Sequence, residues 1–175
     1  MTCIAVLRQE DNIWMAGDRG ASDEDTILPL TAPKVFKIGP YLIGYAGSMD
    51  GERIRYNFKP PVPKANTDLE KFMYTEFLVS LRNFYEAWWV DISKDSDFGM
   101  IICINGKIYE HNAADMSLTT YESEYLTMGS GGSIALGALY ATSNQKNARR
   151  RVQLAVEAAV KFSTSCLGPV DVIWI

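Results

Sequence analysis

Four residues that are widely separated in the sequence carry side chains that together could perform nucleophilic catalysis: Thr2, Asp18, Lys34 and Ser130. Aminopeptidases normally remove an initiating methionine that precedes a residue as small as threonine. The mature chain would then begin with Thr2, which carries a hydroxyl and a free α-amine on adjacent atoms. One residue would thus supply both a nucleophile and a base.

The chemistry of Thr2 depends on that base and on a nearby positive charge. An α-amine titrates at a pH of about 7.7–8 in model peptides, so it can accept the hydroxyl proton directly or through one water. A strand beginning at Cys3 would hold Thr2 at the end of a sheet, and we expect Lys34 to lie close by. Its ammonium group would favour the neutral amine and stabilise a developing alkoxide. Asp18, at the end of the adjacent strand, would anchor Lys34 and balance its charge.

The segment Gly129-Ser130-Gly131-Gly132 has two interpretations. In the structural one, small residues let a strand turn sharply into a helix, and Ser130 or Ser133 caps that helix. In the functional one, the Ser130 hydroxyl and the amides at the helix N-terminus polarise a substrate or position a water. The segment lacks the lysine of a phosphate-binding P-loop. Taken alone, it leaves both interpretations open.

The composition limits the classes of protein and partner that the chain fits. It has 175 residues, enough for one domain spanning residues 1–175 with a substantial core. A net charge of -4 and a pI of about 5.0 argue against a nucleic-acid partner, because phosphate binding needs a basic face. No apolar run approaches the roughly 18 residues of a membrane-spanning helix, and residues 1–11 have too short an apolar stretch for a signal peptide. We therefore expect a cytoplasmic protein with no membrane partner.

The cysteines and the single histidine narrow the kinds of site further. Cys3, Cys103 and Cys166 are too far apart for a paired zinc motif or a disulfide framework, so we expect buried thiols and no metal or cofactor. Serine or cysteine hydrolysis through an imidazole would have to use His111 alone. His111 ends the alternating stretch 107–111, which is typical of an exposed strand, so we expect a solvated histidine.

The periodicity of the sequence predicts strands, two helices, strands, two helices and a last strand. Thr67 and Glu70 form a capping-box pattern at the start of the longest helix, and a loop with Asp23, Glu24 and Asp25 is expected after the second strand. Two antiparallel sheets packed face to face with helices outside, a four-layer αββα sandwich of the α+β class, would bury every apolar stripe. The predicted strands cover residues 3–8, 12–17, 34–38, 41–45, 98–104, 107–111, 118–121, 124–128 and 170–175, and the helices 48–58, 67–89, 133–141 and about 144–163.

Six segments in the same order and at similar spacing occur in a known family. The chain resembles the proteasome β-subunit family, including the proteasome-like peptidase of the bacterial HslUV complex, over nearly its whole length. The matching segments are Thr2, Ala16-Gly17-Asp18, Lys34, Tyr45-Ala46-Gly47-Ser48, Gly129-Ser130-Gly131-Gly132 with Ala135-Leu136-Gly137, and Gly168-Pro169-Val170-Asp171-Val172.

The resemblance implies the N-terminal-nucleophile (Ntn) hydrolase fold and a threonine peptidase that needs no cofactor. Thr2 would be the nucleophile, with Asp18, Lys34 and Ser130 as its catalytic partners. The remaining positions implied by the resemblance fall into three groups. They are an oxyanion donor at Gly47 or Gly44 with Gly131 as support; a strand-like substrate site along Ala21-Ser22 and Gly47-Ser48; and a pocket for the residue before the cleaved bond formed by Tyr45, Met49, Ala32 and Phe36.

Two features depart from the family pattern. An aspartate and a serine often precede the last glycine turn in the family and support the nucleophile, and here Ser163 and Cys166 stand in their places. A serine there can form a hydrogen bond but supplies no charge. Only Met1 precedes Thr2, which is similar to the HslUV-type peptidase and disfavours a purely gating role like that of proteasome α-subunits.

The family resemblance also implies partners. Family members form rings of six or seven subunits, single or stacked in pairs, that enclose their polypeptide substrate and can bind an AAA+ unfoldase. The run Arg149-Arg150-Arg151 could serve such contacts through an acidic partner, or be a solvated positive turn. Two other functions remain open: an Ntn amidohydrolase with a different substrate class, and a catalytically silent assembly protein that keeps Met1.

Overall fold

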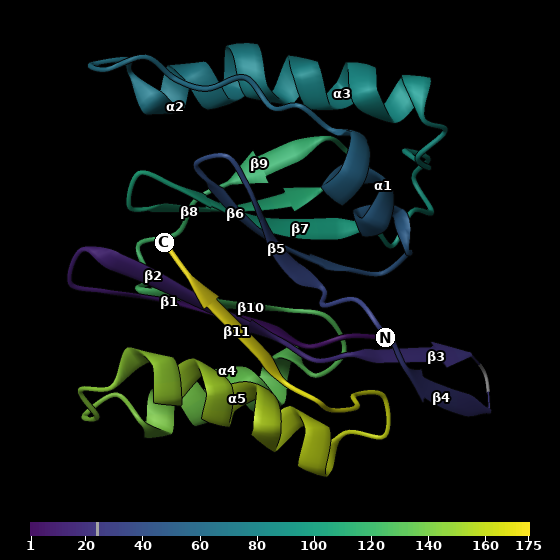
Figure 1. Ribbon diagram of the computed structural model, residues 1–175, viewed down its shortest axis with the longest axis vertical. Helices are drawn as coiled ribbons and strands as arrows, with labels where there is room; N and C mark the ends of the chain where they lie inside the picture. The colour runs from purple at the N-terminus through teal and green to yellow at the C-terminus, as the bar shows by residue number, and fades with distance from the viewer. Residues whose placement is uncertain (24) are drawn as a thin grey trace.

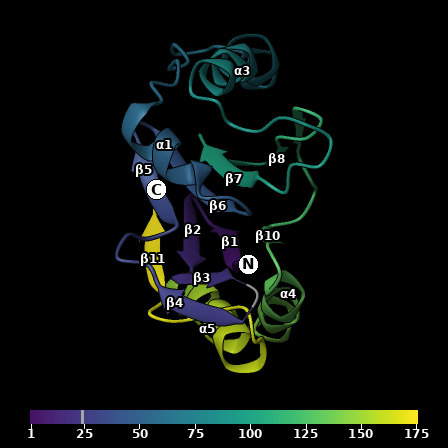
Figure 2. The ribbon, with the colours of Figure 1, turned by 90° about the vertical axis from the view of Figure 1, so that its right-hand side faces the viewer.

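Two antiparallel sheets lie face to face, and helices cover their outer faces, in the computed structural model, which describes residues 1–23 and 25–175 (Figure 1). The first sheet has the strand order β10-β1-β2-β11, and the second has the order β5-β6-β7-β8-β9. The turned view separates the four layers: the α3 layer, the second sheet, the first sheet, and the layer of α4 and α5 (Figure 2). This is the expected αββα sandwich.

The strands agree closely with the predicted ranges. The first sheet consists of β1 (Ile4–Gln9), β2 (Asn12–Gly17), β10 (Tyr125–Met128) and β11 (Asp171–Trp174). The second consists of β5 (Val35–Ile38), β6 (Tyr41–Ala46), β7 (Gly99–Ile104), β8 (Lys107–Asn112) and β9 (Ser117–Thr119). The helices are α1 (Asp50–Asn57), α2 (Leu69–Phe72), η1 (Met73–Phe77), α3 (Leu78–Ala87), α4 (Gly132–Ala141) and α5 (Ala148–Phe162).

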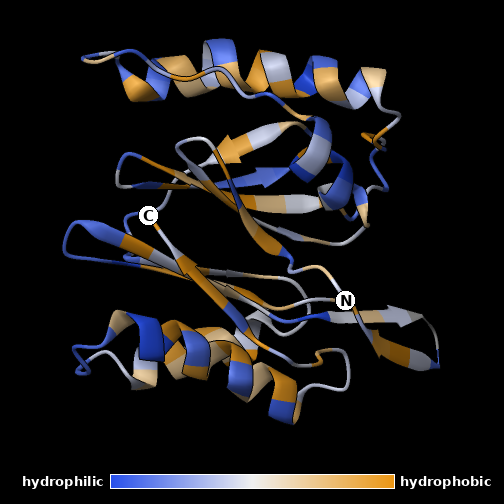
Figure 3. Ribbon diagram, in the orientation of Figure 1, coloured by the Kyte–Doolittle hydropathy of each residue, from blue (hydrophilic) through white to orange (hydrophobic). Residues whose placement is uncertain are grey.

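Alternation along β1 explains how one strand contributes to two layers of core. Ile4 and Val6 face the second sheet and pack in the inter-sheet cluster. Cys3, Ala5 and Leu7 point the other way and pack under α4 and α5. Because both faces are covered, the strand reads as a nearly continuous apolar run instead of alternating with polar residues. In Figure 3 the hydrophobic colour marks strands of both sheets between the helical layers, except that β8 is largely blue, while the outer helices alternate in colour.

The helix predicted over residues 67–89 is divided and starts later. Its N-cap is Asp68, whose carboxylate accepts a hydrogen bond from the Lys71 amide at 3.1 Å, so the expected capping role of Thr67 is wrong. Residues 73–77 form a π-helical turn between α2 and α3. A π-turn shifts the side chains of the helix around its axis, which the stripe of apolar residues alone does not reveal.

Two further expectations need correction. The stretch expected as a loop after β2 forms a hairpin of β3 (Gly20–Asp23) and β4 (Thr26–Pro29); Glu24 lies outside the described residues. Helix α5 begins after the Asn147 cap and not near residue 144. Of the three arginines at that end, Arg151 is buried, and Arg150 pairs with Glu157 of the same helix at 3.1 Å. Among the described residues, no helix has the length and apolar character needed to cross a bilayer.

His111 is fully buried, so the expectation of a solvated surface histidine is wrong. Tyr109 and His111 share the face of β8 that packs under α3, where the imidazole lies 5.7 Å from the Tyr85 ring. Its Nδ1 is 2.8 Å from the Ser117 carbonyl oxygen, while Nε2 has no hydrogen-bond partner among the residues that the structure describes. Burial disfavours the charged form and lowers the pKa of His111 to about 4, against the opposing effects of the Ser117 carbonyl and of Asp115.

The burial of His111 predicts that the free energy of unfolding depends on pH through this side chain. The unfolded chain protonates His111 at a pH of about 6.5 and the folded chain only at about 4, so the free energy of unfolding should fall by up to about 3 kcal/mol as the pH drops through that window. We expect His111→Phe to remove most of this slope. Urea denaturation of both proteins between about pH 7 and about pH 4 measures it. Since the chain has one histidine, equal slopes in the two proteins would contradict the assignment.

Candidate active site

Three strands bring Thr2, Asp18 and Lys34 together. In the register of β1 and β2, Ile4 pairs with Gly17, so Thr2 and Asp18 leave the same end of the sheet, and the Asp18 amide donates to the Cys3 carbonyl at 3.1 Å. Lys34 directly precedes β5, at the corresponding end of the second sheet. Its Nζ lies 3.0 Å from Thr2 Oγ1 and 2.9 Å from Asp18 Oδ1. The ammonium group therefore connects the hydroxyl to the carboxylate.

The Asp18–Lys34 ion pair is buried, with side chains 0% and 2% exposed. Besides Lys34, the Asp18 carboxylate accepts three backbone amides: those of Cys3 at 2.9 Å, Gly20 at 2.8 Å and Leu167 at 3.2 Å. Lys34 also donates to the Gly20 carbonyl. A buried charge pair is tolerated only when the remaining lone pairs and protons are satisfied, and here they are. The network fixes Lys34 Nζ at the threonine hydroxyl.

Ser130 lies at the amide nitrogen of Thr2. The turn into α4 passes through Gly129, whose φ of +89° favours glycine and where a Cβ would come within 2.3 Å of the Thr2 carbonyl oxygen. Gly131 then donates its amide to that carbonyl at 3.0 Å. The Thr2 amide donates to Ser130 Oγ at 3.1 Å. The glycine turn thus serves both interpretations, since it starts a helix and also places a hydroxyl beside Thr2.

The sequence interpretation missed Ser165. Its Oγ is 2.8 Å from Ser130 Oγ and 2.7 Å from Ser163 Oγ, so three hydroxyls form a chain that ends at the Thr2 nitrogen. Cys166, expected in a supporting position, instead faces the Cys3 thiol beneath Gly131. Hydrogen bonding with that thiol is the largest influence on Cys166 and lowers its pKa. The run Ser163-Thr164-Ser165-Cys166 offers four small side chains, and only the path of the loop decides which one reaches Ser130.

Met1 occupies the space in front of the nucleophile. The Thr2 hydroxyl donates to the Met1 carbonyl at 2.6 Å, and Lys34 donates to the same oxygen at 3.2 Å. The Thr2 nitrogen is an amide while Met1 is attached, so it cannot accept a proton. Removal of Met1 would free the hydroxyl, leave the lysine with three acceptors for its three protons, and convert the nitrogen into an amine held by Ser130.

Two pockets adjoin Thr2, and Met1 and Gly47 line both of them. The smaller, of about 130 Å³, is lined by the expected substrate residues Ala21, Ser22, Gly47, Ser48, Tyr45 and Met49, together with Gly20 and Lys34. Ala32 and Phe36 do not line it; the Phe36 ring is buried and packs against Tyr45, with centroids 6.3 Å apart. Gly44 faces the inter-sheet core, where a Cβ would meet Ile4 and Met15 at 2.8 Å. Gly47, with a φ of +88°, lines both pockets.

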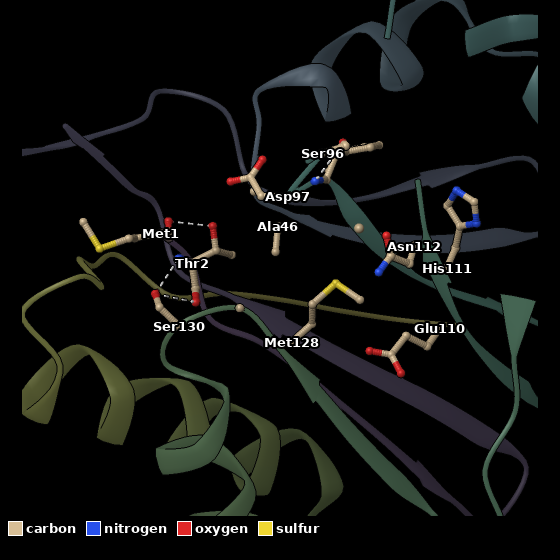
Figure 4. A pocket seen from close by; sticks show the side chains of 14 residues that line it. Met1, Thr2, Ala46, Ser96, Asp97, Glu110, His111, Asn112, Met128 and Ser130 are labelled. Carbon is tan, nitrogen blue, oxygen red and sulfur yellow. Dashed lines mark hydrogen bonds between the residues drawn. The ribbon is translucent and has the colours of Figure 1, made fainter. Parts of the chain in front are cut away.

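The larger pocket, of about 380 Å³, extends from Thr2 and Ser130 between the two sheets (Figure 4). In the close-up, Thr2 and Ser130 lie at one end, Glu110 and Asn112 at the other, and Met128 between them. Among the described residues, no group of three histidine, cysteine or acidic side chains is arranged to hold a metal ion.

This geometry is suited to acyl transfer through a hydroxyl. Lys34 can stabilise the alkoxide by charge, a backbone amide beside the hydroxyl can stabilise the oxyanion of a tetrahedral intermediate, and an amine at Thr2 can move the proton. His111 is among the residues that line the larger pocket, but its imidazole is turned away from Thr2 and lies beside the Tyr85 ring (Figure 4).

No family model and no curated protein matches the sequence. Solved structures do match over nearly the entire chain. BPH from Thiobacillus denitrificans in complex with epoxomicin has a TM-score of 0.81 at 18% identity, covering 99% of this chain and 98% of that one. A second structure of Thiobacillus denitrificans BPH has a TM-score of 0.80 at 19% identity, with coverage of 99% and 97%. Eukaryotic HslV from Trypanosoma brucei scores 0.72 at 20% identity, with coverage of 99% and 98%. The chain therefore has the proteasome-like Ntn-hydrolase fold of these structures.

Proposed function

We propose that this protein is an N-terminal-nucleophile threonine peptidase of the proteasome-like family, with residues 1–175 forming its catalytic domain. The observation that carries the proposal is the position of Lys34 Nζ, 3.0 Å from Thr2 Oγ1, with the Thr2 nitrogen 3.1 Å from Ser130 Oγ. The fold does not require a buried lysine paired with an aspartate beside a threonine hydroxyl. A pair of apolar residues would fill the same space without the desolvation penalty of two buried charges.

The proposed reaction begins once Met1 is removed. Thr2 Oγ1 attacks a peptide carbonyl while the Thr2 α-amine accepts the hydroxyl proton, and the oxyanion is stabilised by the Gly47 amide. The C–N bond then breaks, and the α-ammonium gives its proton to the leaving amine. Water, deprotonated by the same amine, hydrolyses the ester and frees the threonine hydroxyl. Ser130, backed by Ser165, would hold the amine in position for each transfer.

The small pocket supports binding of the residue before the cleaved bond. Its lining by Ala21, Tyr45 and Met49 suits an apolar side chain of modest size, and the strand edge at Ala21-Ser22 suits an extended peptide. The neighbouring structure of BPH holds epoxomicin, and we expect an epoxyketone of this type to react with Thr2 in this chain.

We further propose that the protein works in the cytoplasm as a homo-oligomeric ring of six or seven copies, single or stacked, with an AAA+ unfoldase as a partner. Exposed aromatic side chains on the outer helices and on the segment after α3 support such contacts. They are Tyr56, Trp89, Tyr140 and Phe162, which are 71% to 84% exposed in the single chain.

Intact-mass analysis of the purified protein with and without an epoxyketone tests the catalytic proposal. We expect loss of Met1 and one adduct per chain, and no adduct in Thr2→Ala. A mature chain that binds no inhibitor and cleaves no peptide would contradict the proposal. Retained Met1 without an adduct would favour the silent assembly protein, which the contacts of the Met1 carbonyl with Thr2 and Lys34 make a specific alternative. An adduct with turnover only of small amides would favour an amidohydrolase.

A further inference from the structure

We propose that the larger pocket binds the part of a polypeptide that follows the cleaved bond, and that Asp97 and Glu110 make it prefer lysine or arginine there. This inference rests on the proposed peptidase function and adds a substrate preference to it. The pocket has about 380 Å³, opens directly on Thr2 and is distinct from the smaller pocket beside Ala21.

The direction of the substrate follows from the position of the proton donor. The leaving amine must receive its proton from the Thr2 nitrogen, which lies 3.1 Å from Ser130 Oγ. Gly129 and Ser130 line the larger pocket and do not line the smaller one. The amine that leaves, and the residues attached to it, must therefore lie on the side of the larger pocket. The acyl half then lies in the smaller pocket, and Gly47 lines both pockets.

The side chains around the larger pocket give it a negative character. Asp97 precedes β7 and is exposed, whereas Glu110, on β8, is partly buried and accepts a hydrogen bond from the Tyr121 hydroxyl. In the described part of the chain, neither carboxylate has a lysine or arginine nitrogen within 4.0 Å, and the residues that line the pocket include no lysine or arginine. Lys34 forms its ion pair with Asp18, behind the proposed nucleophile.

The shape of the pocket suits a long side chain. Met128 forms its middle, between Thr2 at one end and Glu110 at the other (Figure 4). A lysine or arginine stem can lie along the methionine while its charged end reaches the carboxylate. Carboxylates at a partly open site contribute modestly to binding, so two of them predict a preference of roughly 10-fold for a basic over a neutral side chain.

Internally quenched peptides that differ only in the first two residues after the cleaved bond test this inference. With mature protein, we expect kcat/KM to be roughly 10-fold higher with Lys or Arg than with Gln, lower still with Glu, and the ratio to shrink as salt rises from about 50 mM to about 500 mM. Mass spectrometry of the products checks that the same bond is cut in every peptide.

The variants assign the preference to the two carboxylates. In the double variant Asp97→Asn, Glu110→Gln, the Lys to Gln ratio should fall close to one. Glu76→Gln, which removes one charge from the exposed face of η1, should keep the wild-type ratio. Cleavage without a basic preference, or a ratio that survives in the double variant, overturns this inference and leaves the peptidase proposal intact. Absence of both cleavage and epoxyketone adduct overturns the two together.

Discussion

Replacing Lys34 by methionine is expected to slow acylation of Thr2 roughly 1000-fold, because it removes the one charge that faces the developing alkoxide. The Lys34 side chain is 2% exposed, so water cannot substitute for the ammonium group. Loss of the counter-charge to buried Asp18 should lower the free energy of unfolding by about 3–5 kcal/mol, but its carboxylate keeps three backbone amide donors, so we expect the fold to survive. The rate of epoxyketone adduct formation, followed by intact mass on protein that has lost Met1, measures the effect.

A variant of Asp18, the ion-pair partner of Lys34, tests how much the ion pair contributes to stability. Asp18→Asn places an amide NH₂ where a carboxylate oxygen accepts from Gly20 and Leu167, and it leaves Lys34 without its counter-charge, so it should also lower the free energy of unfolding by about 3–5 kcal/mol. Lys37→Met is the matched control, because Lys37 is on the same strand but exposed and near the Trp174 ring. Lys34→Met reacting within ten-fold of the wild-type rate would show that the lysine is not part of the chemistry.

The proximity of Thr2 and Asp18 was predictable because strand pairing in a sheet converts sequence distance into proximity. Once residues 3–8 and 12–17 are recognised as a hairpin, the residue before one strand and the residue after the other must lie at the same edge, which places Thr2 beside Asp18. Lys34 precedes β5 of the second sheet, so its place beside Thr2 depends on how the two sheets pack and not on strand pairing. Resemblance to a family added the roles of these residues, and residue types alone could not have supplied them.

The predictions that failed concern orientation more than element type. The strand of His111 was predicted, but alternation does not reveal which face of a strand a helix will cover, and α3 covers the one with Tyr109 and His111. Ser165 was missed for a related reason. Its neighbours Ser163 and Cys166 have the same small size, and the loop before β11 determines which hydroxyl faces Ser130.

Gly47→Ala is expected to reduce kcat/KM for peptide cleavage by roughly 100- to 1000-fold, the cost of losing one oxyanion donor. The φ of Gly47 is +88°, and an added Cβ would lie 2.2 Å from the Asp97 carbonyl oxygen and 2.6 Å from its carbon. Both atoms belong to the backbone, so no side-chain rotation can relieve the overlap. The segment must shift, and the Gly47 amide would then leave the position proposed for the oxyanion donor.

Gly39→Ala is the control for Gly47→Ala, because it measures the loss of stability caused by a positive φ at a position away from the candidate site. Gly39 also has a positive φ, of +54°, but no atom lies within 4 Å of its would-be Cβ, and it is in the turn between β5 and β6, far along the strand from Lys34. This variant should lose about 1 kcal/mol of stability and keep its activity. If Gly47→Ala also cleaved peptides at nearly the wild-type rate, the oxyanion donor would have to be sought elsewhere around Thr2, and the amides at the start of α4 would be the next group to alter.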